Sequence, residues 1–193
     1  MSELENKAKP ILLKLFNVQQ LPELSKTKRR ILALWATKTA FMLNRSSNYD
    51  QVVLDTEIRA LNGGQSLPEH ISVFLAVNPL PYEIDWLETV NWNYIIPDDQ
   101  TMVRADGWRI SLQIGRLCLI VAKPPDKRMK VVHCSNLHLP LIDSDTELPE
   151  LRMMTADGSR SAREHHWRIV DAFKAVFPGY DGSEVAGSYT HKY

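Results

Sequence analysis

The chain has 193 residues, 44% of them hydrophobic, which is enough to bury one substantial core. Lysine plus arginine and aspartate plus glutamate number 23 each, so the formal charge is zero and no whole-molecule field attracts nucleic acid or acidic membranes. Any such partner would have to be held by a local patch. No apolar run approaches the roughly 20 residues of a spanning helix, and the N-terminus lacks the layout of a signal peptide. We therefore expect a cytoplasmic protein without a membrane partner.

The first third of the chain has the spacing of helices. Ser2 and Glu5 form a potential capping box, and Ser25 can cap a second helix. Pro10 lies inside the first helix and predicts a kink or break near residues 6–9, because it removes one backbone hydrogen bond. The apolar periodicity and the stop signals together predict helices over residues 2–16, 25–44, 50–61 and 68–75.

Extended structure is predicted beyond residue 78. The strongest strand pattern covers residues 108–122, where Gly115 would mark a bulge or bend between two strand halves. A turn at 123–128 then leads to a partner strand at 129–134, which would make a hairpin with a basic tip. Two shorter extended stretches are expected around residues 84–87 and 91–96.

The last third contains fewer signals. Residues 135–159 have the composition of a long irregular connection, and Ser159 or Ser161 can cap a last helix that ends near residue 177. Helices followed by an antiparallel sheet predict an α+β fold in which N-terminal helices pack on the sheet, with a C-terminal helix. We expect one domain over residues 1–178 and a poorly ordered tail over 179–193. Cys118 and Cys134 lie in apolar, strand-like surroundings and are expected to be reduced core residues.

Lys38 is the most unusual residue of the second helix. At 100° per residue it falls in one arc with five large apolar side chains, namely Ile31, Leu34, Trp35, Phe41 and Met42, which predicts that its ammonium points toward the core. Such a group must be paired, neutralised or reach water along its stem. It could serve a binding pocket, or it could form a structural ion pair, with Glu57, Glu83 or Asp85 as conceivable partners. The structural interpretation is favoured.

Basic residues gather at two places in the sequence. Lys26, Lys28, Arg29 and Arg30 occupy the first turns of the second helix, where the helix dipole disfavours each cation mildly. They could be a solvated helix end, or they could bind phosphate or an acidic surface. The predicted hairpin tip carries a second group that would extend the patch if the two lie together: Lys123, Lys127, Arg128 and Lys130.

Histidines suggest a third, weaker site. His165 and His166 are adjacent on a predicted helix, so they point about 100° apart and cannot both ligate one metal without other ligands. His133 and His138 straddle the end of a strand, but no Cys-x-x-Cys pair or carboxylate spacing supports a metal centre there. The chain also lacks the phosphate-binding and nucleophile-elbow motifs of common enzymes. No metal and no cofactor is expected.

Two segments, residues 1–12 and 32–42, resemble the region that follows the zinc-binding module in bacterial HNH-endonuclease-like proteins. Shorter matches extend the resemblance to about residue 122 and comprise Pro68-Glu69-His70, Pro79-Leu80-Pro81, Trp86-Leu87 and Ile114-Gly115-Arg116-Leu117. The HNH module, with its metal-binding residues, would precede Met1, and no position here matches its motif. The resemblance implies an accessory domain without nuclease residues.

These observations predict a non-catalytic binding or accessory domain, from a bacterium or phage, that contacts DNA or a protein partner through a local basic patch. Two alternatives remain. One is a metal-dependent hydrolase or nuclease that uses His133, His138, His165 or His166. The other is a protein-binding antagonist of a defence complex.

Overall fold

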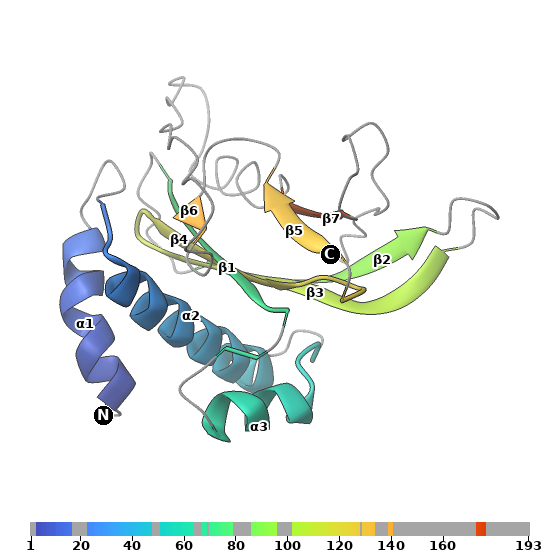
Figure 1. The fold of residues 1–193 in the computed structure, drawn as a ribbon, viewed down its shortest axis with the longest axis horizontal. Coiled ribbons are helices and arrows are strands. Elements are labelled where there is room, and N and C mark those ends of the chain that lie inside the picture. The colour runs from blue at the N-terminus through green and yellow to red at the C-terminus, as the bar shows by residue number, and fades with distance from the viewer. Residues whose placement is uncertain are drawn as a thin grey trace.

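The computed structural model describes residues 3–16, 23–47, 51–63, 67–68, 70–78, 86–95, 102–127, 129–133, 139–140 and 173–176. Three helices come first, α1 (Glu3–Leu15), α2 (Lys26–Ser46) and α3 (Asp55–Gly63), and seven strands follow. The helices lie on one side of a twisted antiparallel sheet (Figure 1). This arrangement confirms the α+β class and the order of helices before strands.

The main sheet has five strands in the order β2-β3-β4-β1-β6, and every neighbouring pair is antiparallel. A second sheet pairs β5 with β7. The strand bounds are β1 (Ser72–Val77), β2 (Trp86–Ile95), β3 (Met102–Ile114), β4 (Leu117–Lys123), β5 (Lys130–His133), β6 (Leu139–Pro140) and β7 (Phe173–Val176).

The helix predictions need two corrections. α1 is one helix through Pro10, without the predicted break. Pro10 lies on the exposed side of α1, where water can solvate the carbonyl that loses its hydrogen bond. Residues 68–75 do not form a helix, because β1 begins at Ser72. A short, continuously apolar segment has no periodicity that separates a buried strand from a buried helix.

The strand predictions need three corrections. Gly115 does not bend one strand but lies in the turn between β3 and β4, where its φ is 57°. β5 pairs with β7 and not with β4, because β3 and β1 already occupy both edges of β4. The two stretches expected near 84–87 and 91–96 are one strand, β2.

The predicted last helix is contradicted at its end, because Phe173–Val176 is strand β7. The rest of that helix lies outside the described residues, as do most of the 135–159 connection and the tail at 179–193. Cys118 is buried and is not part of a disulfide, as expected for a reduced core residue, whereas Cys134 lies outside the described part.

The predicted apolar arc of α2 is confirmed in part. Leu34 and Phe41 are buried, and Ile31 and Trp35 pack against the core, whereas Met42 is 59% exposed. The arc missed a row of small buried residues, namely Ala33, Ala36, Thr37 and Ala40. Such side chains add little to a hydrophobic pattern, yet they fill a closely packed interior as well as large ones do.

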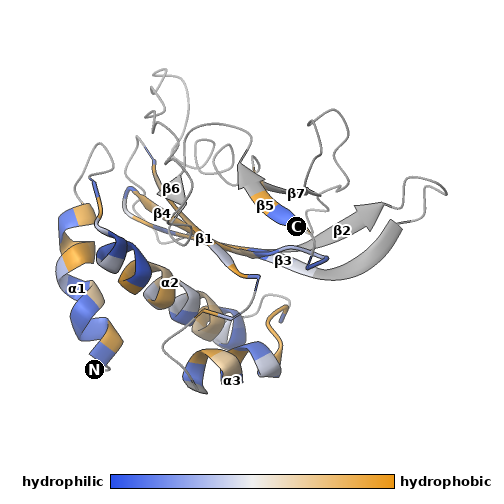
Figure 2. Ribbon diagram, in the orientation of Figure 1, coloured by the Kyte–Doolittle hydropathy of each residue, from blue (hydrophilic) through white to orange (hydrophobic). Residues whose placement is uncertain are grey.

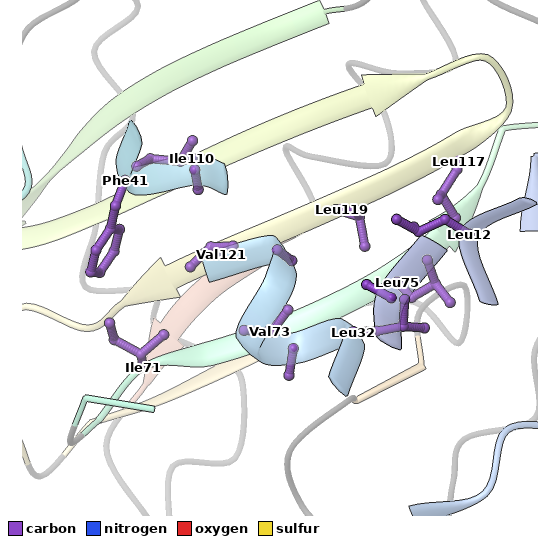
Figure 3. Close-up of a cluster of buried hydrophobic side chains, with 14 of the residues drawn as sticks. Leu12, Leu32, Phe41, Ile71, Val73, Leu75, Ile110, Leu117, Leu119 and Val121 are labelled. Atoms are coloured by element: carbon purple, nitrogen blue, oxygen red, sulfur yellow. The ribbon is translucent and has the colours of Figure 1, made fainter. Parts of the chain in front are cut away.

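In β1, β4 and residues 107–114 of β3, both faces of the main sheet are largely buried but differ in chemistry. The face toward the helices is apolar, and its cluster includes Leu12 of α1, Leu32 of α2 and Leu75 of β1 (Figure 3). Phe41 packs edge-on against Trp108, with ring centroids 5.7 Å apart. On the opposite face, apolar residues of β4 pair with three fully buried polar residues of β3, which are Arg109, Ser111 and Gln113, and a fourth, Asn78, directly follows β1.

Strand β7 covers part of this second face. The ring of Phe173 lies 4.5 Å from the ring of Phe74 on β1, measured between centroids, and Phe173 is fully buried. The β5–β7 pair therefore lies on the side of the main sheet opposite the three helices, as Figure 1 also shows.

Candidate nucleic-acid interface

The first turn of α2 concentrates positive charge at a helix N-terminus. Ser25 is the N-cap, and its Oγ accepts a hydrogen bond from the Lys28 backbone N–H at 3.4 Å. Lys26, Lys28 and Arg30 are exposed, Arg29 is half-buried, and the first turn contains no acidic residue. Because the dipole makes this end of a helix electropositive, the cations and the backbone N–H groups add to the same positive potential.

The end of α1 lies beside the start of α2. Lys38 of α2 contacts Glu5 of α1, and the two helices run antiparallel. Moving from Glu5 toward the end of α1 therefore corresponds to moving from Lys38 toward the start of α2, so that Leu12 lies level with Leu32. Figure 3 shows Leu12, Leu32 and Leu117 close together. The last turn of α1, which carries the exposed Lys14, is therefore next to the first turns of α2.

The turn between β3 and β4 reaches the same end of the molecule. A Cβ built on Gly115 would lie 4.0 Å from the carbonyl oxygen of Phe16, which follows α1 directly. Arg116, the second residue of this turn and half-buried, therefore belongs to the same end of the molecule as the last turn of α1. We call this surface the basic end, and it comprises Lys14, Lys26, Lys28, Arg29, Arg30 and Arg116.

Few acidic residues accompany these cations. Glu23 is the single carboxylate in the sequence between residues 14 and 30, and residues 107–125 contain none. In Figure 2 the start of α2 and the β3–β4 turn are both coloured as hydrophilic, at the same end of the ribbon. The basic end is thus a local concentration of positive charge on a chain whose net charge is zero.

The second predicted basic group lies elsewhere. Lys123 is at the opposite end of β4 from Arg116, which is about 20 Å for a seven-residue strand. Its Nζ is 2.7 Å from Oε1 of Glu57, so this cation is engaged in an ion pair with α3. Lys127 and Lys130 are exposed, and Arg128 is outside the described residues. The structure therefore does not bring the two groups into one patch.

Lys38 does not point into the core as its helical position predicted. Its Nζ lies 3.1 Å from Oε1 of Glu5, and the two side chains are 28% and 36% exposed. None of the three expected carboxylates is the partner in this ion pair. Lys38 therefore joins α1 to α2 at a half-exposed position, which matches the structural interpretation of this residue.

The described part of the chain contains no group of three or more His, Cys, Asp or Glu residues that could hold a metal ion, so it gives no support to the histidine site. His133 is in strand β5, and His138, His165 and His166 lie outside the described residues. Among the described helices, none is long and apolar enough to cross a membrane.

Two members of the basic end were missed in the sequence, Lys14 and Arg116. Gly115-Arg116 stands between an alternating segment and a continuously apolar one. This position could have indicated a tight turn, because glycine is favoured at the first central position of a type II′ hairpin turn. Nothing in the sequence indicated that this turn approaches the end of α1. Comparison with family models, curated proteins and solved structures gives no match for this chain.

Proposed function

We propose that the chain is a non-catalytic accessory domain that binds nucleic acid through its basic end, contacting the phosphate backbone. The observation that supports it is that six cations from three separate segments lie at one end of the molecule. Glu23 is the single carboxylate in the sequence between residues 14 and 30, and residues 107–125 contain none. Clustered lysine and arginine on one end of a domain are the electrostatic footprint of a phosphate-binding surface. The resemblance of residues 1–122 to the accessory region of HNH-type nucleases points to DNA in particular.

The stability of α2 gives a second argument for a binding role. Each cation in the first turn of a helix costs roughly 0.3–1 kcal/mol when exposed. Neutral residues at Lys26 and Lys28 would leave the N-cap contact of Ser25 intact, since that contact uses a backbone N–H. The cations therefore lower the stability of α2 through their interaction with the helix dipole, and a bound phosphate would offset this loss.

The test is the salt dependence of binding to a labelled DNA duplex, measured by fluorescence anisotropy. For wild type, the slope of log K against log salt should be about −3 to −5, because each phosphate contact contributes about −0.9. The triple variant Lys26→Gln, Lys28→Gln and Arg30→Gln should reduce the magnitude of this slope by about 3. The thermal unfolding midpoint of the variant, measured alongside, separates a loss of phosphate contacts from a loss of folded protein.

The matched control is the double variant Lys127→Gln and Lys130→Gln, which removes exposed cations from the other end of β4. It should bind with the wild-type slope. Absence of duplex binding at about 50 mM salt, or an equal loss in the control, would overturn the proposal and favour a protein partner.

A further inference from the structure

The turn that carries Arg116 is held by two buried amide side chains. Asn78 and Gln113 are both fully buried on the second face of the main sheet. The Asn78 side-chain Nδ2 donates to Gln113 Oε1 at 3.1 Å, and Gln113 Nε2 donates to the carbonyl oxygen of Gly115 at 2.9 Å. The backbone N–H of Asn78 donates to the carbonyl oxygen of Arg116 at 2.7 Å. We call Asn78 and Gln113 the amide brace.

The amide brace secures the two central residues of the turn from the inside. Gly115 and Arg116 each have their carbonyl oxygen engaged by the brace. Gly115 has φ 57°, and its backbone also approaches the end of α1. A two-residue turn fixed in this way has little backbone freedom, so the position from which Arg116 extends is set before any ligand arrives.

Burying two amides has a cost that apolar residues would avoid. A buried amide that loses its partner is unfavourable, and strand β1, which ends one residue before Asn78, is apolar apart from its first residue. The two members of the brace bond to each other and to the turn. Their placement is therefore coupled to the conformation of the Gly115-Arg116 turn.

We infer that Asn78 and Gln113 are positioning residues, which preorganise Arg116 as a contact to the nucleic-acid phosphate backbone beside the α2 cations. This inference rests on the proposed function, because it assigns Arg116 to the same binding surface. It specifies a backbone contact rather than base recognition, since a guanidinium on a fixed turn can bind phosphate oxygens in a bidentate manner independently of sequence.

The experiment compares salt slopes of duplex binding for variants of the turn and of the brace. Arg116→Gln should reduce the magnitude of the slope by about 1, and Arg116→Lys should restore most of it. Gln113→Leu should give a similar reduction, and the double variant Gln113→Leu with Arg116→Gln should lose no more than Arg116→Gln alone. Hydrogen exchange at the Asn78 backbone N–H should accelerate in Gln113→Leu, which reports release of the turn independently of any ligand.

Asn44→Leu is the matched control for general destabilisation. Asn44 is another fully buried amide, and its Oδ1 accepts hydrogen bonds from the backbone N–H groups of Val52 and Val53, far from the basic end. It should lower thermal stability without changing the salt slope. If wild type binds and depends on the α2 cations, but Arg116→Gln or Gln113→Leu keeps the wild-type slope, the inference fails and the proposed function stands. If wild type does not bind, both fail.

Discussion

Lys38 and Glu5 join the two long N-terminal helices through a contact of 3.1 Å between Nζ and Oε1, at a position where both side chains still reach water. The pair lies where α1 and α2 pack against each other. The antiparallel packing of the two helices brings the end of α1 beside the start of α2, and with it Lys14 beside the cations at residues 26–30. The apolar core between the helices, rather than this half-exposed ion pair, is what holds that arrangement.

Replacing Lys38 by methionine should have little effect on stability. Half-exposed ion pairs contribute about 0–1 kcal/mol, and methionine keeps the apolar stem that packs along α2. Urea denaturation of Lys38→Met should therefore give a free energy of unfolding within about 1 kcal/mol of wild type. Leu32→Ala, in the second turn of the same helix, should cost about 2–5 kcal/mol and serves as the reference. A large loss of stability or of duplex binding in Lys38→Met would give this lysine a role beyond helix pairing.

The pair of Lys123 and Glu57 should behave differently, because both side chains are mostly buried. Their Nζ and Oε1 are 2.7 Å apart, and the other carboxylate oxygen of Glu57 accepts the backbone N–H of Leu54 at the start of α3. Lys123→Met leaves this carboxylate without its cation, which should cost about 1–3 kcal/mol in urea denaturation. Adding Glu57→Gln should recover part of the loss.

The exposed Lys130 offers the comparison for that pair. Lys130→Met should change the free energy of unfolding by less than about 0.5 kcal/mol. Equal effects at Lys123 and Lys130 would show that the ion pair with α3 contributes nothing to stability.

Gly107 is required by close packing. A Cβ at this position would lie 2.6 Å from the backbone nitrogen and 2.7 Å from Cδ of Pro125, which belongs to the segment after β4. Since a proline ring and its backbone cannot move aside as a flexible side chain can, Gly107→Ala should cost about 1–3 kcal/mol. Thermal unfolding measures this loss. A wild-type midpoint for Gly107→Ala would contradict the close approach of β3 to Pro125.

The carboxyl of Glu3 should titrate below its ordinary range. The hydrogen bond from Lys7, together with the charge of Lys7, lowers the pKa of this exposed group. Because the pKa of Glu3 is lower in the folded than in the unfolded protein, its ionised carboxylate stabilises the folded state. This contribution to the free energy of unfolding is present in full above the unfolded pKa and is lost as the pH falls through the folded pKa. NMR titration of the side-chain carboxyl should show a higher pKa in Lys7→Met than in wild type. Identical titration curves would refute the contact.

The local features of this fold were predictable, and the long-range ones were not. The Ser25 cap and the alternation from Trp108 to Ile114 correctly indicated α2 and the C-terminal half of β3. Strand β1 was missed because a short apolar run fits a strand or a helix equally well. The pairing of β5 with β7 joins residues 40 to 46 positions apart, from His133 with Phe173 to Lys130 with Val176, and no local pattern encodes such a contact.

The candidate site was likewise half predictable. The cations at residues 26–30 are visible in the sequence because they occupy one turn of one helix. Lys14 and Arg116 join them only through tertiary packing, in which the β3–β4 turn reaches the end of α1. The buried face of α2 was predicted only in part, because hydrophobic periodicity gives weight to large side chains, whereas Ala33 and Ala36 are among its most buried residues.

The most direct test of the account is to titrate the labelled protein with a short DNA duplex and map the backbone amide shifts by NMR. The account predicts that the largest shifts cluster at Lys14, residues 25–30 and Arg116, and that they shrink as salt is added. Shifts centred instead on residues 123–130 at the other end of β4, or no shifts at low salt, would contradict it.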